Sequence, residues 1–354
     1  MAPGRNLVVA VPGLAGGVDE AARHLFDDPV LRQNWSIRVL TTKGRRPLAA
    51  PAVFATALCT LVVLRLRGRV DLLHLNVSKQ GSTLRKCMVA GVARLLGIPY
   101  VVQLHSGGFA DFLRDLPAWA HRPVRGLFGG ARHVFVLGLP FQELVQEALG
   151  VPGEKVSILR NGVALPPAPA ARAGRRPVIL FTGRMGQGKG TFDLLEALAR
   201  IADLDWSAVL VGDGEIEQVL ARAETLGLAD RLTIRGWQPR TVIDELLASS
   251  DVFVLPSYVE ALSVSLLEAM AAGLCCIGTL VGAHGEVLFH EDNGLVVIPG
   301  DVEGLAAGLA RVLSDDDLRA RLGARARQTI ADSCSTGVVS AELNGWYERV
   351  LAPA

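Results

Sequence analysis

The chain has few cysteines and few aromatic residues, and both shortages narrow the functions open to it. Its 354 residues include five cysteines without a Cys-x-x-Cys pair: Cys59, Cys87, Cys275, Cys276 and Cys334. An odd number of cysteines without paired spacing argues against a disulfide scaffold or a zinc site and indicates a reducing compartment. Aromatic residues make up 5% of the chain, and no basic stripe is interleaved with them. Nucleic acid is therefore not an expected partner.

The chain also lacks a clear membrane span, although one segment approaches it. Residues 47–64 carry no charge and are flanked by basic residues on both sides. Pro47 and Pro51 shorten the usable helix to roughly a dozen residues, so a core helix or a helix lying on a membrane is favoured over a spanning one. The apolar run at 7–11 is too short for a secretory signal. We expect a cytoplasmic protein, with peripheral attachment to the inner face of the membrane as an open alternative.

Hydrophobic residues make up half of the chain, enough for two cores. Short apolar runs alternate with helical or loop segments. The first six are at 7–11, 36–42, 71–77, 99–105, 133–138 and 156–159, and the second six are at 177–183, 207–214, 231–237, 251–257, 275–280 and 294–300. This alternation predicts two doubly wound α/β domains, residues 1–165 and 177–330, joined by a linker at 166–176 that is rich in proline and arginine.

Charge is divided unequally between the two halves. Residues 1–170 contain 20 Lys and Arg against 10 Asp and Glu, a formal charge of +10, whereas residues 171–354 carry −9. The electrostatic field of such an uneven charge distribution favours contact between the basic half and an anionic partner. For the first half, that partner is expected to be a phosphate on an acceptor or an anionic membrane surface.

The apolar run at 177–183 leads into a glycine-rich turn with two cations, GRMGQGKG at 183–190. Glycines such as Gly183 let the backbone approach a phosphate, and Arg184 and Lys189 can neutralise it. The turn differs from a P-loop because Gly190 follows the lysine where Ser or Thr would hold magnesium. A P-loop-like NTPase is therefore only a remote alternative.

A pair of glutamates follows the apolar run at 251–257. Glu260 lies in the turn after this run, and Glu268 lies about two helical turns further on, so both can face a ligand at the carboxyl edge of a parallel sheet. The backbone amides of Ala261, Leu262 and Ser263 open the helix and can add to a phosphate site. Because Arg184 and Lys189 can neutralise the charge of a bound diphosphate, no metal or other cofactor is required.

These segments, in this order, resemble the GT-B retaining glycosyltransferases of family 4. The resemblance rests on FTGRMGQGKGTFDLLEAL, VLVGDGEIEQVL, RLTIRGW and the long segment from ASSDVFVLPS to GLVVIPGD, and it covers most of residues 177–313. It implies two Rossmann-like domains that face a central cleft, and a nucleotide-diphosphate sugar as donor. It also implies retention of anomeric configuration and a last segment, 331–354, that packs back on the first domain.

The resemblance also implies roles for individual residues. Glu260 is expected to contact the donor sugar, Glu268 the ribose hydroxyls, and the turn at Gly236 and Trp237 the base. In the first domain, His105 is similar to the family's active-site histidine. From the residues themselves, Gly16 and Gly17 are expected to open a helix and let the backbone approach the donor phosphate or the acceptor. His74, inside an apolar run, is expected to be structural.

Two departures from the family pattern concern the donor site. Ala261 stands where glycine is commonest, which is tolerable if its φ stays negative. His284 and Gly285 replace an apolar residue and a proline, so the loop before Glu286 is expected to differ in shape.

The function expected from these features is transfer of a sugar to a glycan or lipid-linked acceptor in polysaccharide or glycoconjugate biosynthesis. Two alternatives stay open. A nucleotide-sugar epimerase or hydrolase of the same architecture would turn over the donor without an acceptor, and a membrane-docked binding protein would have lost the chemistry.

Overall fold

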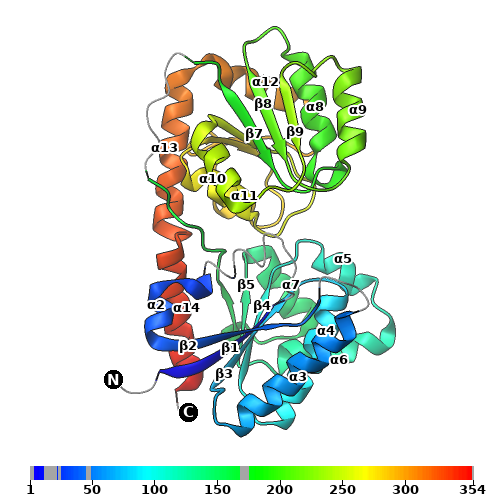
Figure 1. Cartoon of the computed structure of the whole chain (residues 1–354), viewed down its shortest axis with the longest axis vertical. Helices are drawn as coiled ribbons and strands as arrows, with labels where there is room; N and C mark the ends of the chain where they lie inside the picture. Colours follow the sequence, from blue (N-terminus) through cyan, green and yellow to red (C-terminus); the bar gives the residue numbers. More distant parts are fainter. Residues whose placement is uncertain (1–3, 12–21, 23–24, 45–48, 168–174, 353–354) are drawn as a thin grey trace. The chain divides into compact units, whose positions relative to one another are not determined.

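The computed structural model describes residues 4–11, 22, 25–44, 49–167 and 175–352, and it divides into two compact units (Figure 1). The first unit comprises Met1–Gly162 together with Thr336–Ala354, and the second comprises Val163–Ser335. Each unit is built around one parallel six-stranded sheet. Most of the expected linker at 166–176, and both Gly16 and Gly17, lie outside the described residues.

The sheet of the first unit has the strand order β2-β1-β3-β4-β5-β6. Its strands are β1 (Arg5–Val11), β2 (Trp35–Thr41), β3 (Leu72–Val77), β4 (Tyr100–Leu104), β5 (His133–Val136) and β6 (Val156–Ile158). Every neighbouring pair is parallel. The six apolar runs predicted for this half are therefore all strands, and most of their residues are buried because helices cover the sheet.

Seven α-helices accompany this sheet among the described residues. They are α2 (Pro29–Asn34), α3 (Ala50–Leu66), α4 (Gly81–Leu95), α5 (Phe109–Arg114), α6 (Ala118–Gly129), α7 (Leu139–Leu149) and α14 (Thr336–Leu351). The prediction of roughly a dozen helical residues around 47–64 was wrong, because α3 has 17 residues. Pro51 lies in the first turn, where its missing N–H would have no intrahelical partner. In the described part of the chain, no helix is long and apolar enough to cross a membrane.

The final helix, α14, is held to the first unit by polar contacts inside an aromatic core. The Tyr347 hydroxyl lies 2.7 Å from His74 Nδ1, and Trp35 Nε1 donates to Asn344 Oδ1 at 2.8 Å. The rings of Trp35 and Tyr347 meet edge to face. His74 and Tyr347 are fully buried, so the structural role expected for His74 is confirmed.

The sheet of the second unit has the strand order β12-β11-β10-β7-β8-β9. Its strands are β7 (Val178–Thr182), β8 (Ser207–Val211), β9 (Leu232–Arg235), β10 (Val252–Leu255), β11 (Cys275–Gly278) and β12 (Leu295–Val296). All six predicted runs are again strands. The order reverses between β7 and β10, which pair directly. In doubly wound sheets, the carboxyl edge at such a reversal is the place where ligands bind.

Helices flank this second sheet (Figure 1). They are α8 (Thr191–Arg200), α9 (Ile216–Thr225), α10 (Arg240–Ser249), α11 (Val264–Ala271), α12 (Val302–Ser314) and α13 (Asp316–Ser333). Helix α8 packs against α9 and α12, and α11 packs against α13. Cys275 and Cys276 are buried in β11.

Burial makes the first unit sensitive to acid through His74. Burial and, to a lesser extent, the nearby His105 lower the pKa of His74 to about 3. Between about pH 3 and pH 6.5, the histidine is protonated in the unfolded chain but neutral in the folded protein. The contribution of neutral His74 to the free energy of unfolding is therefore complete above pH 6.5 and is lost as the pH falls toward 3.

We expect the variant His74→Gln to reduce the pH dependence of stability, because glutamine keeps hydrogen-bonding atoms and does not titrate. The slope lost is about 1.4 kcal/mol per pH unit in this window. Urea unfolding of the full chain between about pH 7 and pH 5 measures it. His121→Gln, at a half-buried histidine of the same unit, serves as the control. An unchanged slope in His74→Gln would contradict the prediction.

Candidate active site

The glycine-rich turn that follows β7 brings a lysine to the end of the neighbouring strand β10. Residues Gln187–Lys189 form a short 3-10 turn, and Gly190 then starts α8 in the left-handed region, at φ 65°. A Cβ on Gly190 would lie 2.1 Å from the carbonyl oxygen of Pro256. Only glycine therefore permits this approach, which places Lys189 beside the loop that follows β10.

Lys189 and Glu260 form an ion pair between Nζ and Oε1. Ser257 Oγ donates to the same carboxylate oxygen at 3.0 Å. The Glu260 side chain is only 10% exposed and that of Lys189 is 25% exposed, so the pair is partly screened from water. The two segments singled out in the sequence thus meet at the carboxyl edge of the sheet, where the strand order reverses.

Glu268 is held by a cation that the sequence did not reveal. Its Oε1 pairs with Arg240 Nη1, at the start of α10, and Arg240 also lies 2.7 Å from Asp244. Burial works against the charge of Arg240, but Glu268 and Asp244 outweigh it and raise the pKa of the guanidinium above its ordinary value. Arg240 lies three residues after Trp237, and only this nearness to the expected base-binding turn was available as a signal.

Arg184 and Trp237 are more exposed than the two glutamates. Arg184 lies on the same turn as Lys189, and its Cγ would be 3.1 Å from a Cβ on Gly214. No ion pair of Arg184 is seen among the described residues. Trp237 follows Gly236 after β9 and is 64% exposed. The structure thus places both residues on the unit that carries Glu260 and Glu268, with their side chains open to solvent.

The turn that opens α11 is also defined. Ser263 caps the helix, because its side chain accepts from the Leu266 amide. The amide of Ser263 itself donates to His284 Nε2 at 3.2 Å. Ser263 was expected to offer this amide to a ligand, but the structure turns it toward the protein. Positive φ angles occur at only two described non-glycine residues, Gln80 and Glu291, so Ala261 fits the turn without strain.

In the first unit, His105 lies directly after β4 and is buried. Because the Asn76 Oδ1 atom can only accept, His105 Nε2 must donate across the 2.7 Å that separates them. Burial lowers the pKa of His105 to about 4, so the ring is neutral near pH 7. In the described part of the chain, no group of three or more His, Cys, Asp or Glu side chains is arranged to hold a metal ion.

Comparisons with known proteins identify both units. Residues 167–329 match the family described as glycosyl transferases group 1, and residues 3–162 match the glycosyl transferase 4-like domain. The chain belongs to the group 1 glycosyl transferases. The resemblance that the sequence motifs carried is thereby confirmed.

Two curated relatives show different extents of similarity to this glycosyltransferase. The 2-deoxystreptamine glucosyltransferase of Streptomyces kanamyceticus is 30% identical over 328 residues, which cover 85% of this chain and 83% of that protein. The N-acetyl-alpha-D-glucosaminyl L-malate synthase of Bacillus anthracis is 34% identical over 176 residues. That alignment spans 49% of this chain and about half, 46%, of the relative.

Solved structures support the fold of the glycosyltransferase. HepE of Anabaena, crystallised with UDP, superposes with a TM-score of 0.78 at 18% identity, covering 98% of this chain and 100% of that one. The predicted GT-B class, with two doubly wound α/β units, is confirmed.

We expect Gly190→Ala to destabilise the second unit, because the new Cβ meets the Pro256 carbonyl and φ is left-handed. The expected loss is about 2 kcal/mol or more of unfolding free energy. Gly188→Ala is the matched control, since a Cβ there has nothing within 4 Å. Urea unfolding of both variants measures the difference, and equal midpoints would refute the role assigned to Gly190.

Proposed function

We propose that this glycosyltransferase moves a sugar from a nucleotide-diphosphate sugar to a glycan or lipid-linked acceptor. The reaction retains anomeric configuration, needs no metal ion, and serves polysaccharide or glycoconjugate biosynthesis. The observation that carries the proposal is the Lys189–Glu260 pair at the strand-order reversal of the second unit. A cation for the diphosphate and an acceptor for the sugar hydroxyls stand there side by side.

Departure of a nucleoside diphosphate leaves negative charge on its terminal oxygen, and Lys189 and Arg184 supply the neutralising charge. Unit charges about 4 Å apart interact by roughly 4 kcal/mol at an effective dielectric near 20. This is enough to change the rate by a hundredfold or more. Binding of UDP by HepE supports a nucleotide donor of this kind.

The two ion pairs prepare the glutamates for a hydroxyl-rich ligand. Lys189 and Ser257 both contact the same oxygen of Glu260, which leaves the other oxygen to accept from the donor sugar. When the diphosphate binds, it replaces Glu260 as the ion-pair partner of Lys189. Arg240 likewise orients Glu268, and the carboxylate of Glu268 accepts from the ribose hydroxyls.

In the first unit, His105 acts as a neutral hydrogen-bonding group near the reacting sugar, because its lowered pKa keeps the ring uncharged near pH 7. The amide of Asn76 fixes the ring through Nε2. Gly16 and Gly17 are proposed to approach the donor phosphate or the acceptor.

We expect Lys189→Ala to slow donor consumption by a hundredfold or more, since the departing diphosphate loses a cation. Arg222→Ala, which removes an exposed pair with Glu196, is the control and should retain activity. A thermal-shift screen with UDP, GDP and ADP first selects the base, because binding stabilises the folded state. Unchanged turnover in Lys189→Ala would remove the leaving-group role.

The same assay separates transfer from the alternatives. Turnover that needs an acceptor supports transfer, whereas equal donor consumption without one would indicate an epimerase or hydrolase.

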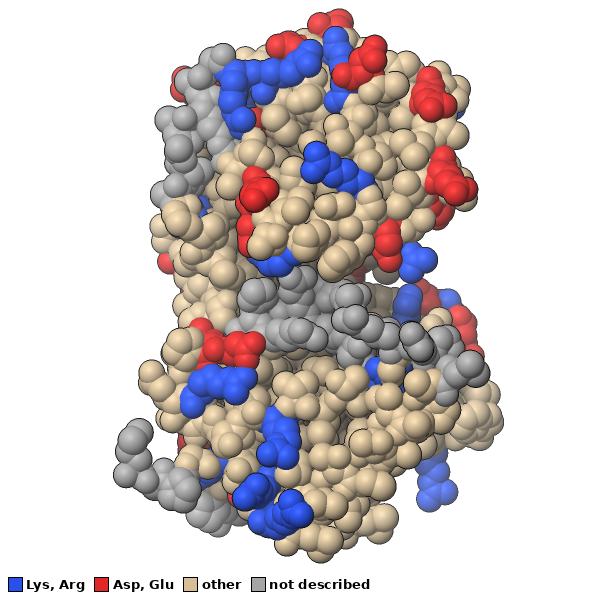
Figure 2. Space-filling view, viewed as in Figure 1, with Lys and Arg blue, Asp and Glu red and all other residues tan. Residues whose placement is uncertain are grey.

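The first unit also carries a surface suited to an anionic membrane. Leu66, at the end of α3, is 79% exposed, and Leu95, at the end of α4, is 89% exposed. The ends of these helices are joined, because Arg65 Nε donates to the Leu96 carbonyl at 3.0 Å. Arg65, Arg67 and Arg69 are exposed around the same end. In the face drawn in Figure 2, Lys and Arg side chains lie on both units, and several of them lie on the lower part of the first unit.

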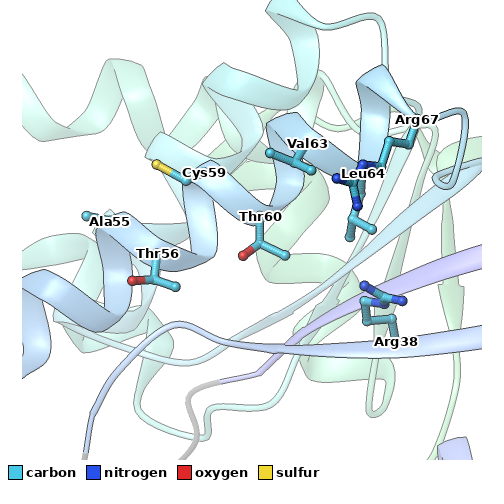
Figure 3. A pocket seen from close by; sticks show the side chains of 8 residues that line it. All are labelled: Arg38, Ala55, Thr56, Cys59, Thr60, Val63, Leu64 and Arg67. Carbon is cyan, nitrogen blue, oxygen red and sulfur yellow. The ribbon is translucent and has the colours of Figure 1, made fainter.

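A groove beside α3 continues this surface (Figure 3). Its volume is about 390 Å³, and it lies between α3 and strand β2. Val63 and Leu64 line it, and at one end Arg67, at the end of α3, and Arg38 on β2 lie on opposite sides of the groove. Exposed apolar side chains bordered by arginines can enter the headgroup region of anionic lipid. We propose that this surface attaches the enzyme to the inner face of the membrane.

We expect the triple variant Arg65→Gln, Arg67→Gln, Arg69→Gln to bind anionic vesicles more weakly. Each basic residue near a membrane surface contributes about 1 kcal/mol to the binding free energy. Co-sedimentation at low and high salt measures this binding. Arg200, Arg222 and Arg311 to Gln, three exposed arginines of the second unit, form the control. Equal binding of both triple variants, or no binding of the parent at low salt, would overturn the membrane proposal.

A further inference from the structure

Two loops at the carboxyl edge of the second sheet are joined by hydrogen bonds. One follows β10 and carries Glu260, and the other follows β11. Thr279 Oγ1 donates to the Ser257 carbonyl at 2.6 Å, and the Ala283 amide donates to the Ala261 carbonyl at 2.8 Å. The position of Glu260 therefore depends on the loop that follows β11.

The contact is closest at Gly282. Its φ is 59°, and a Cβ there would lie 2.3 Å from the Glu260 carbonyl and 2.5 Å from that of Ala261. No side chain fits between the loops at this point. The close contact between the two loops thus requires glycine at position 282.

His284 is buried at the centre of this contact and makes two hydrogen bonds that fix its protonation. Its Nδ1 lies 3.0 Å from the Thr279 carbonyl, which can only accept. Its Nε2 lies 3.2 Å from the Ser263 amide, which can only donate. The ring must therefore be neutral, with its proton on Nδ1. Any other form would leave one of these partners unmatched.

We propose that His284 is a positioning residue for the donor site. It joins the loop after β11 to the amino end of α11, and so holds the turn that carries Glu260 while keeping the Ser263 amide turned into the protein. This inference rests on the proposed function, because it assigns Glu260 to the donor sugar.

The charges around His284 are compatible with a neutral ring. Burial lowers the pKa of His284, and this effect exceeds the opposing influence of Glu260 and of the hydrogen bond to Thr279. Lys189 lowers it further. His284 thus stays uncharged beside the Lys189–Glu260 pair near pH 7, and it leaves the charge balance of that pair unchanged.

An apolar side chain at this position would fill the space but make neither hydrogen bond. A helix N-terminus has amides that need partners, and unmatched buried amides cost stability. Replacing His284 by leucine should therefore release the Ser263 amide and loosen the turn. Glutamine can restore the acceptor for that amide, because its side-chain oxygen reaches as far as Nε2.

The first test reads the tautomer in the unliganded full chain. Imidazole nitrogen spectra of the protein with ¹⁵N-labelled histidine, near neutral pH, should contain one ring with the proton on Nδ1 that disappears in His284→Gln. A ring at this position that carries its proton on Nε2, or that is doubly protonated, would overturn the proposal. This test needs no activity, so it stays decisive even if the protein is not a transferase.

The second test compares three variants by hydrogen exchange and by donor KM. His284→Leu should speed exchange of the amides around 260–266 and raise the donor KM about fivefold, the loss expected for one hydrogen bond. His284→Gln should restore both toward the parent values. His290→Gln, at an exposed histidine six residues away, is the control.

The outcomes of the second test are distinct. Unchanged exchange in His284→Leu, or equal effects of the leucine and glutamine variants, would show that the hydrogen bond to Ser263 has no positioning role. Faster exchange in the leucine variant with rescue by glutamine supports that role, whatever the chain's activity proves to be. If the leucine variant fails to fold, the smaller His284→Ala replaces it, because it also leaves the Ser263 amide without an acceptor; exchange around 260–266 as slow as in the parent would then overturn the proposal.

Discussion

The close approach between the glycine-rich turn and the strand beside it is the constraint on which the site depends. At Gly190 the backbone passes so close to the Pro256 carbonyl that no side chain fits. This contact places Lys189 beside Glu260. The pair then sits where β7 and β10 meet and the strand order reverses. A charged pair at this edge is stable because each partner offsets the other's cost of leaving water, and because Ser257 adds a hydrogen bond to the carboxylate.

Buried neutral histidines recur in this enzyme, and each is tied to a different task. His74 lies in the core that anchors α14, His105 lies at the carboxyl end of β4, and His284 joins the loops that follow β10 and β11. In all three, burial lowers the pKa of the ring and favours its neutral form. In His74 and His284 both ring nitrogens have a hydrogen-bonding partner, and in His105 Nε2 donates to Asn76. A neutral imidazole thus serves here as a rigid polar connector.

Much of the fold was predictable because its signals are local. Each of the twelve apolar runs became a strand, since a buried parallel strand is recognised by its own residues. The length of α3 was underestimated because the proline rule was applied without regard to position, although Pro51 lies in the first turn. For the candidate site, the sequence singled out the glycine-rich turn and both glutamates, which remain predictions, but it did not indicate Arg240 or the hydrogen bonds of His284.

The sequence by itself determined the strands, the glycine-rich turn and the spacing of Glu260 and Glu268, because these follow from residues close together in the chain. Only the tertiary structure decided that Arg240 pairs with Glu268, that His284 receives the Ser263 amide, and that Tyr347 meets His74. These partners lie 21 to 273 residues apart. Their contacts depend on strand order and on the meeting of loops at a sheet edge, which no local pattern encodes.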